Sequence, residues 1–484
     1  MTLEQKQILS ASTLASFLTA FMSSAVNLAL PKIAETFSLG ATTLGWTVTV
    51  YLLVTAVSLL PVGKAADLWG RRRVFILGIL LFLGGTLLAG VAYSGFTLIF
   101  FRAIQGVGGA MIFATSVALL TEVFPPHRRG EVLGINTAVI YLGLSLGPAL
   151  GGVLVQGLGW RSIFFLSCIP GLLSLAVLHR YPGATEGTAE ELSPARNITH
   201  QSHPSRKEDP PQGKQQMGRL TQLDGMGMGL YISAILALAL GLTHIIRLWG
   251  GFLFLGGSIL LYMFLLAEKR QPFPMLEVRL FHSNRVFAFS NLAALVNYAS
   301  TYAVAYLLSL YLQYIQGFPP RKAGLILLIQ PLVQALCTPF AGKASDRIRP
   351  GILASLGMGL TVLGLVLCTW LDAGTSILWV LGSLSLLGLG FGLFSSPNSN
   401  AIMGSVDRRD YSIASATLAT MRLLGQMLSM GITLMVFFLL LGDSPITPQM
   451  YPAFLRGLKI LFGIFSVLNL LGVFASLARG KEKR

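Results

Sequence analysis

Apolar runs of about 20 residues follow one another along almost the whole chain, and they restrict its fold more than any other feature. A run of that length crosses the hydrocarbon core of a bilayer as a helix. The sequence predicts fourteen such spans, at approximately 8–30, 44–65, 74–93, 96–121, 131–157, 161–179, 226–246, 250–268, 286–315, 322–343, 351–371, 376–398, 413–441 and 453–477. Only 11% of the 484 residues are charged, against about 25% in soluble domains. We therefore expect an all-helical membrane protein.

The net charge of +16 comes from Lys and Arg in the links between these runs, which are alternately rich and poor in basic residues. With both termini in the cytoplasm, only seven of the 35 Lys and Arg residues fall in outer links: Lys32, Arg161, Arg247, Arg321, Lys322, Arg456 and Lys459. This is the positive-inside pattern. A nucleic-acid site would instead show one contiguous basic stripe, so nucleic acid is excluded as a partner.

A short basic string occurs twice and indicates an internal duplication. Gly63-Lys64-Ala65-Ala66-Asp67 follows the second span, and Gly342-Lys343-Ala344-Ser345-Asp346 follows the tenth. The prediction is a six-helix bundle over 1–180, an inserted helix pair over 225–268, and a second six-helix bundle over 269–484. The polar stretch 181–224 is predicted to be a disordered cytoplasmic linker. Related halves around a central cleft are typical of transporters.

Three motifs carry a resemblance to a known family. They are GKAADLWGRRR at 63–73, Arg102-x-x-Gln105-Gly106 in span four, and Gly143-x-x-x-Gly147-Pro148-x-x-Gly151-Gly152 in span five. The chain resembles the major facilitator superfamily, and most of all its fourteen-helix drug:proton antiporters. That resemblance implies rocking of two pseudo-symmetric bundles and export of lipophilic compounds against a proton gradient. It implies roles in conformational change for Gly63, Asp67, Arg71, Arg72, Gly143, Gly147, Pro148, Gly342 and Asp346.

The first span departs from the pattern of that family. Where the family usually has an Asp, this chain has Met22, although Asn27 and Pro31 are kept. All 19 Asp and Glu residues lie outside the spans or at their ends, and Glu122 is expected to be the one closest to burial. Proton coupling would then fall to Glu122, Asp67 or Asp346 at the inner face, or to His244 near the outer end, and each of these has a structural role as its alternative.

Polar side chains follow one face of two spans that hold equivalent places in the two halves. In span one they are Ser12, Ser16, Thr19, Ser23 and Asn27; in span nine they are Asn291, Tyr298, Tyr302 and Tyr306, with Asn297 and Thr301 adjacent. Such faces look into a cavity or bond to neighbouring helices. We predict a substrate cavity lined by Ser23, Asn27, Arg102, Gln105, Asn291, Asn297, Tyr298, Thr301, Tyr302, Tyr306 and Arg422.

Two buried cations and one proline leave alternatives open. Arg102 either faces the cavity or a partner, or extends along the helix to the membrane surface. Pro397 is predicted to break span twelve, as a gate or as a simple helix stop. Arg422 would meet an anionic group of the substrate or bond to the carbonyls that Pro397 frees.

Together these features predict a monomeric secondary transporter of the cytoplasmic membrane that exports lipophilic or amphipathic compounds by alternating access, as a proton antiporter. One alternative is a carrier of lipids or anionic metabolites with different or no proton coupling. The other is a membrane sensor without transport. No P-loop or HExxH motif occurs, and the GxSxG spacing of Gly143 to Gly147 lies inside the apolar fifth span rather than at a strand-to-helix turn, so no enzyme activity, cofactor or metal is expected. The expected partners are a small substrate, protons and membrane lipids.

Overall fold

The computed structural model describes residues 1–179, 224–245, 247–271, 276, 278–345, 347–406 and 411–480. Asp346 and the predicted linker, apart from Asp224, lie outside these ranges. Every regular element in the described residues is a helix. Among them, 14 helical segments are long and apolar enough to cross a membrane, which confirms the predicted fold class.

The N-terminal bundle consists of six helices. They are α1 (Leu3–Phe37), α2 (Ala41–Trp69), α3 (Arg71–Gly90), α4 (Gly95–Val123), α5 (Pro126–Leu158) and α6 (Arg161–His179). Helix α1 packs along α5 and α6, and α4 packs between α2 and α3. Each helix therefore buries one side against the bundle and leaves the other for lipid.

The C-terminal bundle repeats this arrangement with two breaks in regular geometry. Its helices are α11 (Arg285–Leu310), α12 (Pro320–Leu327), α13 (Ile329–Ser345), α14 (Pro350–Cys368), α15 (Ile377–Gly404), α16 (Tyr411–Leu441) and α17 (Tyr451–Leu477). Helix α11 continues as a single π-helical turn, η1 (Tyr311–Ile315), and a 3₁₀ turn, η3 (Pro448–Met450), precedes α17. Helices α12 and α13 form one span with a turn at Leu328.

The two inserted helices lie at one side of the molecule. Helix α8 (Gly225–Thr243) packs along α9 (Leu248–Glu268) and also touches α2 and α16, one helix from each bundle. The Tyr231 hydroxyl donates a hydrogen bond of 2.9 Å to the carbonyl oxygen of Ala56. Helix α9 contacts little else and exposes most of its apolar side chains. A short helix, α10 (Val278–Ser283), leads into α11.

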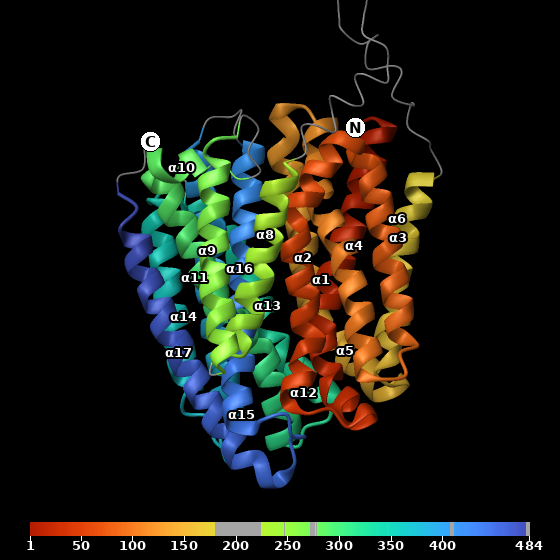
Figure 1. Ribbon diagram of the computed structural model, residues 1–484, viewed down its shortest axis with the longest axis vertical. Helices are drawn as coiled ribbons and strands as arrows, with labels where there is room; N and C mark the ends of the chain where they lie inside the picture. The colour runs from red at the N-terminus through yellow and green to blue at the C-terminus, as the bar shows by residue number, and fades with distance from the viewer. Residues whose placement is uncertain are drawn as a thin grey trace, which may run out of the picture.

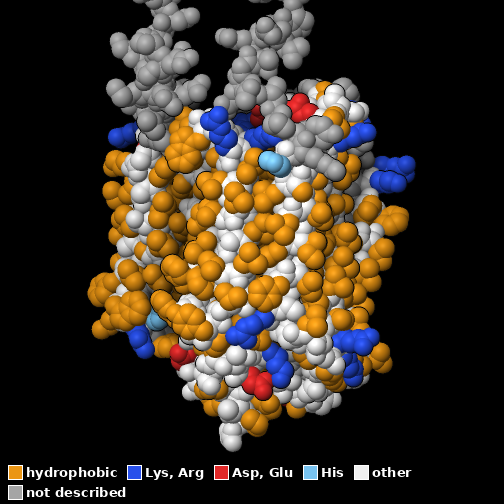
Figure 2. All heavy atoms as spheres, turned by 90° about the vertical axis from the view of Figure 1, so that its right-hand side faces the viewer, with side chains coloured by type: hydrophobic (Ala, Val, Ile, Leu, Met, Phe, Trp, Pro, Cys, Tyr) orange, Lys and Arg blue, Asp and Glu red, His pale blue; other side chains and the backbone are white. Residues whose placement is uncertain are grey.

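Both chain ends lie at the same end of the molecule, which we call the terminal face; α12 lies near the other end, the opposite face (Figure 1). Between these faces the surface is a broad apolar belt, with Lys and Arg side chains gathered above and below it (Figure 2). This distribution matches a protein whose middle lies in hydrocarbon and whose ends lie in water.

Several helices are capped at their N-termini by side chains that accept hydrogen bonds from the free N–H groups of the first turn. Thr2 and Gln5 form a capping box on α1, and Ser94 and Thr97 do the same on α4. The Asn284 side chain accepts a bond of 3.0 Å from the backbone nitrogen of Phe287 at the start of α11. Such caps matter near a membrane because the hydrocarbon core supplies no water to replace them.

One predicted helix boundary is wrong. Pro397 was expected to end the twelfth span, but α15 continues through it to Gly404. A proline inside a membrane helix removes one bond of the ladder, here the bond to the carbonyl oxygen of Leu393, and it can bend the helix without ending it. Beside Pro397, the Ser399 hydroxyl donates to the carbonyl oxygen of Ser395 at 2.9 Å. The Asn398 amide donates to that of Ser290 on α11 at 3.2 Å.

Candidate functional site

The polar faces of α1 and α11 meet where the two bundles touch. The Ser23 hydroxyl lies 3.1 Å from the Tyr302 hydroxyl. The Ser309 hydroxyl donates to the carbonyl oxygen of Asn27 at 2.7 Å, while the Asn27 side-chain oxygen is buried without a partner. The predicted residues Ser23, Asn27 and Tyr302 are therefore brought together, at mid-depth between the bundles.

The other polar residues of α11 divide between this boundary and the interior of their own bundle. Asn291 and Thr301 donate to carbonyls of their own helix, at 2.9 and 2.8 Å. Both amide atoms of Asn297 and the hydroxyl of Tyr306 are buried without a hydrogen-bond partner. Unpaired buried polar groups are costly and rare, so these positions mark a polar interior rather than ordinary apolar packing.

Arg102 is buried in the N-terminal bundle, with 1% of its surface exposed. Its Nε donates to the carbonyl oxygen of Thr47 at 3.1 Å, and a second nitrogen donates to the side-chain oxygen of Gln105. Gln105 donates in turn to the Thr86 hydroxyl at 2.6 Å. The guanidinium lies 4.6 Å from the centre of the Tyr51 ring, and Tyr302 is an electrostatic neighbour. Arg102 therefore turns inward and does not extend to the membrane surface.

Arg422 is half-buried near the middle of α16. Its guanidinium carbon lies 5.7 Å from the centre of the Tyr298 ring, and the Tyr298 ring packs edge-on against Phe391 with centroids 5.3 Å apart. The structure places it beside the α11 polar face rather than on the carbonyls near Pro397.

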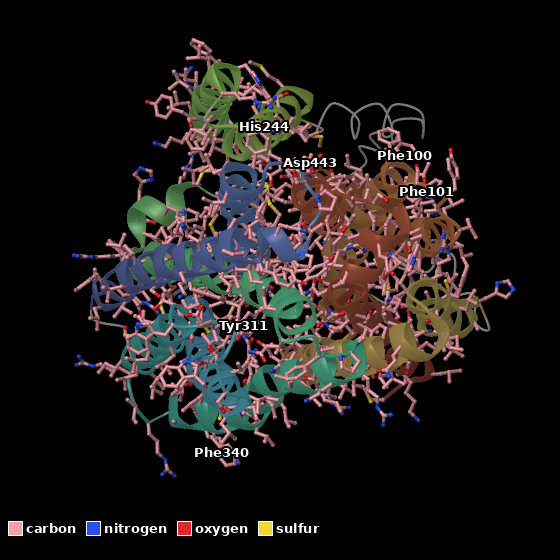
Figure 3. All side chains as sticks on the ribbon, turned by 90° about the horizontal axis from the view of Figure 1, so that it is seen from below. Phe100, Phe101, His244, Tyr311, Phe340 and Asp443 are labelled. Atoms are coloured by element: carbon pink, nitrogen blue, oxygen red, sulfur yellow. The ribbon has the colours of Figure 1, made fainter. Side chains whose placement is uncertain are left out.

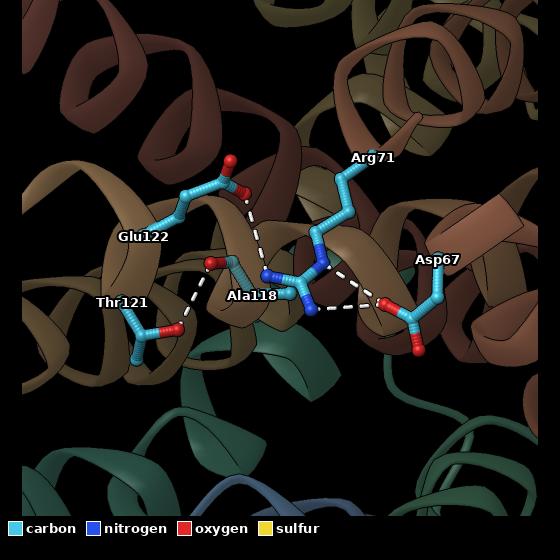
Figure 4. A network of polar contacts seen from close by, with 5 residues as sticks. All are labelled: Asp67, Arg71, Ala118, Thr121 and Glu122. Atoms are coloured by element: carbon cyan, nitrogen blue, oxygen red, sulfur yellow. Dashed lines mark hydrogen bonds and ion pairs between the residues drawn. The ribbon is translucent and has the colours of Figure 1, made fainter. Parts of the chain in front are cut away.

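Charged residues at the terminal face form a bridge that joins three helices. Arg71 on α3 donates two hydrogen bonds to one carboxylate oxygen of Asp67 on α2, at 3.0 and 2.9 Å (Figure 4). It also donates to Glu122 on α4 at 3.3 Å. Arg72 bonds separately to the carbonyl oxygen of Leu178 at 3.2 Å. The expectation that Glu122 is nearly buried is wrong: Glu122 is exposed, because its helix ends at the surface.

A different acid is buried, and the sequence did not single it out. Glu268, the last residue of α9, is 2% exposed and accepts a bond of 3.2 Å from the backbone nitrogen of Leu276. The two glycines of the repeated string also differ from each other. A β-carbon at Gly63 would meet no atom within 4 Å, whereas one at Gly342 would lie 3.1 Å from the Ser396 hydroxyl oxygen.

The glycines of α5 bring three helices together. A β-carbon at Gly143 would lie 2.8 Å from the carbonyl oxygen of Phe17, and one at Gly147 would lie 2.6 Å from the Ser24 β-carbon, both on α1. On the other side, a β-carbon at Gly324 of α12 would lie 2.1 Å from the carbonyl oxygen of Pro148. The motif thus packs α5 within its own bundle and against the other one.

A contact at the opposite face also joins the bundles, and sequence reasoning missed it. Asp443, in the turn after α16, accepts hydrogen bonds from the backbone nitrogen and the hydroxyl of Thr43, at 3.1 and 3.0 Å. The first turn of α2 has no side-chain cap of its own, because its N-cap is Gly40. The Thr42 hydroxyl adds a bond of 2.8 Å to the carbonyl oxygen of Gly442. Asp443 lies beside the bundle boundary when the molecule is viewed from this face (Figure 3).

The inter-bundle hydrogen bonds described above run from mid-depth to the opposite face. A sequence profile described as "Major Facilitator Superfamily" matches residues 12–430. The chain belongs to the major facilitator superfamily. Members of this superfamily are transporters, so the protein is a membrane transporter of a small molecule and not an enzyme. No cluster of three or more His, Cys, Asp or Glu side chains suited to a metal occurs in the residues that the structure describes.

Relatives within the superfamily are named as transporters of different substrates. The chain is 27% identical to a riboflavin transporter, RibZ, of Clostridioides difficile, over 84% of this chain and 82% of that protein. It is 29% identical to the multidrug resistance protein Stp of Mycobacterium tuberculosis, over 83% and 70%. It is 26% identical to the multidrug transporter protein MdtP of Bacillus subtilis, over 87% and 73%.

The superfamily fold is also found in a solved structure. A bacterial homologue of the human lysosomal transporter Spinster, in an inward-facing and unoccupied conformation, superposes with a TM-score of 0.66. The alignment covers 98% of this chain and 97% of that one, at 17% sequence identity. At this identity the likeness concerns the fold alone.

Proposed function

We propose that the protein exports lipophilic or amphipathic compounds from the cytoplasm by alternating access between its two bundles. The observation that carries this proposal is the hydrogen bond between Ser23 and Tyr302, which joins the polar faces of α1 and α11 at mid-depth. A transport site must be reachable from either side in turn, and a site at the boundary between two rigid bodies meets that need. The remaining predicted cavity residues would line the same boundary when it opens.

The proposed transport cycle opens and closes the two faces in turn. Two contacts would hold the opposite face shut in this conformation. They are the hydrogen bonds that Thr43 donates to Asp443, and the close packing of Gly324 on α12 against Pro148 on α5. The bridge from Arg71 to Asp67 and Glu122 would stiffen the terminal face of the N-terminal bundle as it moves. Gly143 and Gly147 would keep α1 and α5 moving as one body.

We place the terminal face in the cytoplasm of a bacterial cell, because the links on that side carry most of the Lys and Arg residues. Proton antiport is part of the proposal, with Asp67 and Glu122 as the carriers among the described residues. Neither lies at mid-depth, and Met22, at 0% exposure, cannot carry a proton. Coupling would therefore act through the terminal-face bridge rather than through a central carboxylate.

Transport by the purified protein in liposomes tests this proposal directly. Vesicles loaded with ethidium or with 1-naphthoate, with and without an imposed pH gradient, would report efflux by fluorescence. We expect efflux of at least one compound that rises with the gradient and is lost in the Arg102→Gln variant. Equal flux in protein-free vesicles would reject transport of this class, and flux that ignores the gradient would reject proton coupling.

A second candidate function, carriage of anionic metabolites or lipids, is favoured by one observation. The two Arg residues inside the predicted spans, Arg102 and Arg422, are buried and half-buried, and every described Asp and Glu lies at a helix end or in a link. A positive interior repels cations and attracts anions.

A further inference from the structure

We propose that Arg422 binds the anionic group of an amphipathic organic anion, at a site within the membrane-spanning helices that Tyr298, Tyr141 and Ser395 complete. This inference rests on the proposed function and names the substrate class of that same site. The residues come from α16, α11, α5 and α15, so the site spans both bundles.

Arg422 is positioned deep in the molecule. It lies eleven residues after the start of α16, about 17 Å along a helix about 46 Å long, and so in the half of the span nearer the terminal face. An unpaired charge inside a membrane span is costly. Such residues normally have a partner or a water-filled cavity, and they mark functional sites.

Arg422 has no acidic partner in the residues that the structure describes. Ion pairs found there involve Lys32, Arg71 and Lys459, and none of these pairs includes Arg422. The contact of Arg422 that we identify is with the face of the Tyr298 ring, at 5.7 Å. That contact uses the π-face of the ring and leaves the planar N–H donors of the guanidinium for an acceptor.

Hydroxyl groups gather around Tyr298, the ring that Arg422 contacts. The Tyr298 side chain has Arg422, Tyr141 and Ser395 among its polar neighbours. The Tyr141 hydroxyl lies 2.5 Å from the Ser395 hydroxyl, and this bond crosses from the N-terminal to the C-terminal bundle. Hydroxyls can donate to a carboxylate or similar anion beside a guanidinium, so the cluster has the donors that an anion needs.

An apolar wall lies next to this cluster. Phe391 packs against Tyr298, and Phe394 follows it with ring centroids 6.4 Å apart. On α16 itself, Leu423 packs with Ala56 and Leu59 of the N-terminal bundle. A ligand with a charged end and a hydrophobic body would therefore find both kinds of contact, as in most small-molecule sites.

Binding of a matched pair of ligands tests the inference. Calorimetry on the purified full-length protein in uncharged detergent would compare 1-naphthoate with the neutral 1-naphthamide. We expect the wild type to bind 1-naphthoate at least about tenfold more tightly, which is about 1.4 kcal/mol. Laurate, with the same carboxylate on an alkyl chain, separates a lipid-like ligand from an aromatic one.

Three variants connect the preference to the side chain. Arg422→Gln should abolish the difference between the two naphthalene compounds, while Arg422→Lys should retain most of it because the charge remains. Arg456→Gln, which removes the same charge from an exposed position on α17, should leave the difference unchanged. Size-exclusion chromatography would confirm that each variant is folded.

The outcomes separate this inference from the proposed function. Equal affinity for 1-naphthoate and 1-naphthamide in the wild type, or an unchanged preference in Arg422→Gln, would overturn the anion site. Ethidium efflux from vesicles would in that case still support export of amphipathic compounds. Failure of the folded wild type to bind any of the three compounds would also overturn the inference, whereas absence of all vesicle transport would overturn the proposed function.

Discussion

The contact between Asp443 and the first turn of α2 predicts a measurable effect on closure of the opposite face. Asp443 accepts bonds from the backbone nitrogen and the hydroxyl of Thr43, and so caps a helix of the other bundle. Loss of an N-cap acid costs about 1 kcal/mol, and loss of its favourable interaction with the helix dipole costs about 0.3–1 kcal/mol. The Asp443→Ala variant should therefore weaken closure by about 1–2 kcal/mol, or about fivefold to thirtyfold in population.

Distances between spin labels would measure that shift. Labels at Glu35, on the last turn of α1, and at Gln449, before α17, lie on exposed positions of different bundles at the opposite face. In Asp443→Ala the distance distribution should move toward longer, open separations. The Thr43→Val variant removes one side of the same contact, so it should shift the distance distribution in the same direction. The double variant should then shift the distribution little more than either single variant does.

A matched control distinguishes capping from a general loss of charge. Asp372 is an exposed acid of the same face, but it pairs with Lys459 inside the C-terminal bundle, at 3.3 Å. Asp372→Ala should leave the distance distribution unchanged. An unaltered distribution in Asp443→Ala, or an equal shift in Asp372→Ala, would refute the reasoning.

Three further predictions concern other parts of the molecule. Arg102→Gln should abolish transport but leave membrane insertion intact, because it breaks the bonds to Thr47 and Gln105; wild-type flux would mean that the network is only structural. Gly147→Val should separate α1 from α5, since a β-carbon there already lies 2.6 Å from Ser24; a thermal unfolding midpoint equal to that of Gly63→Val, where the space is open, would contradict the packing argument. Deletion of 185–215 should be tolerated in expression and size-exclusion profiles, and aggregation of that variant would contradict the proposed linker.

The architecture was predictable because hydrophobic length and backbone bonding leave few alternatives in a bilayer. Fourteen apolar runs can only become fourteen helices, since each must bond its own backbone. The duplicated string and the unequal distribution of basic links then indicated related halves. The error at Pro397 has a physical reason as well: a proline removes one backbone bond and can either bend or end a helix, and the packing of neighbouring helices, which local sequence does not reveal, decides between the two.

The candidate site was predictable only in part. The spacing of Ser23 and Tyr302 placed each on one face of a helix, but nothing in that spacing said that the two hydroxyls would meet. Glu122 and Glu268 show the same limit, because both end an apolar helix, yet only Glu268 is buried.

By itself, the sequence determined which segments leave water and where charge is allowed, because transfer of apolar and charged groups depends on composition over short windows. Only the tertiary structure decided which polar groups face each other across the bundles. It paired Asp443 with Thr43, turned Arg102 toward Gln105, and placed Arg422 beside Tyr298. Those outcomes depend on contacts between residues hundreds of positions apart, whose geometry is set by the packing of whole helices.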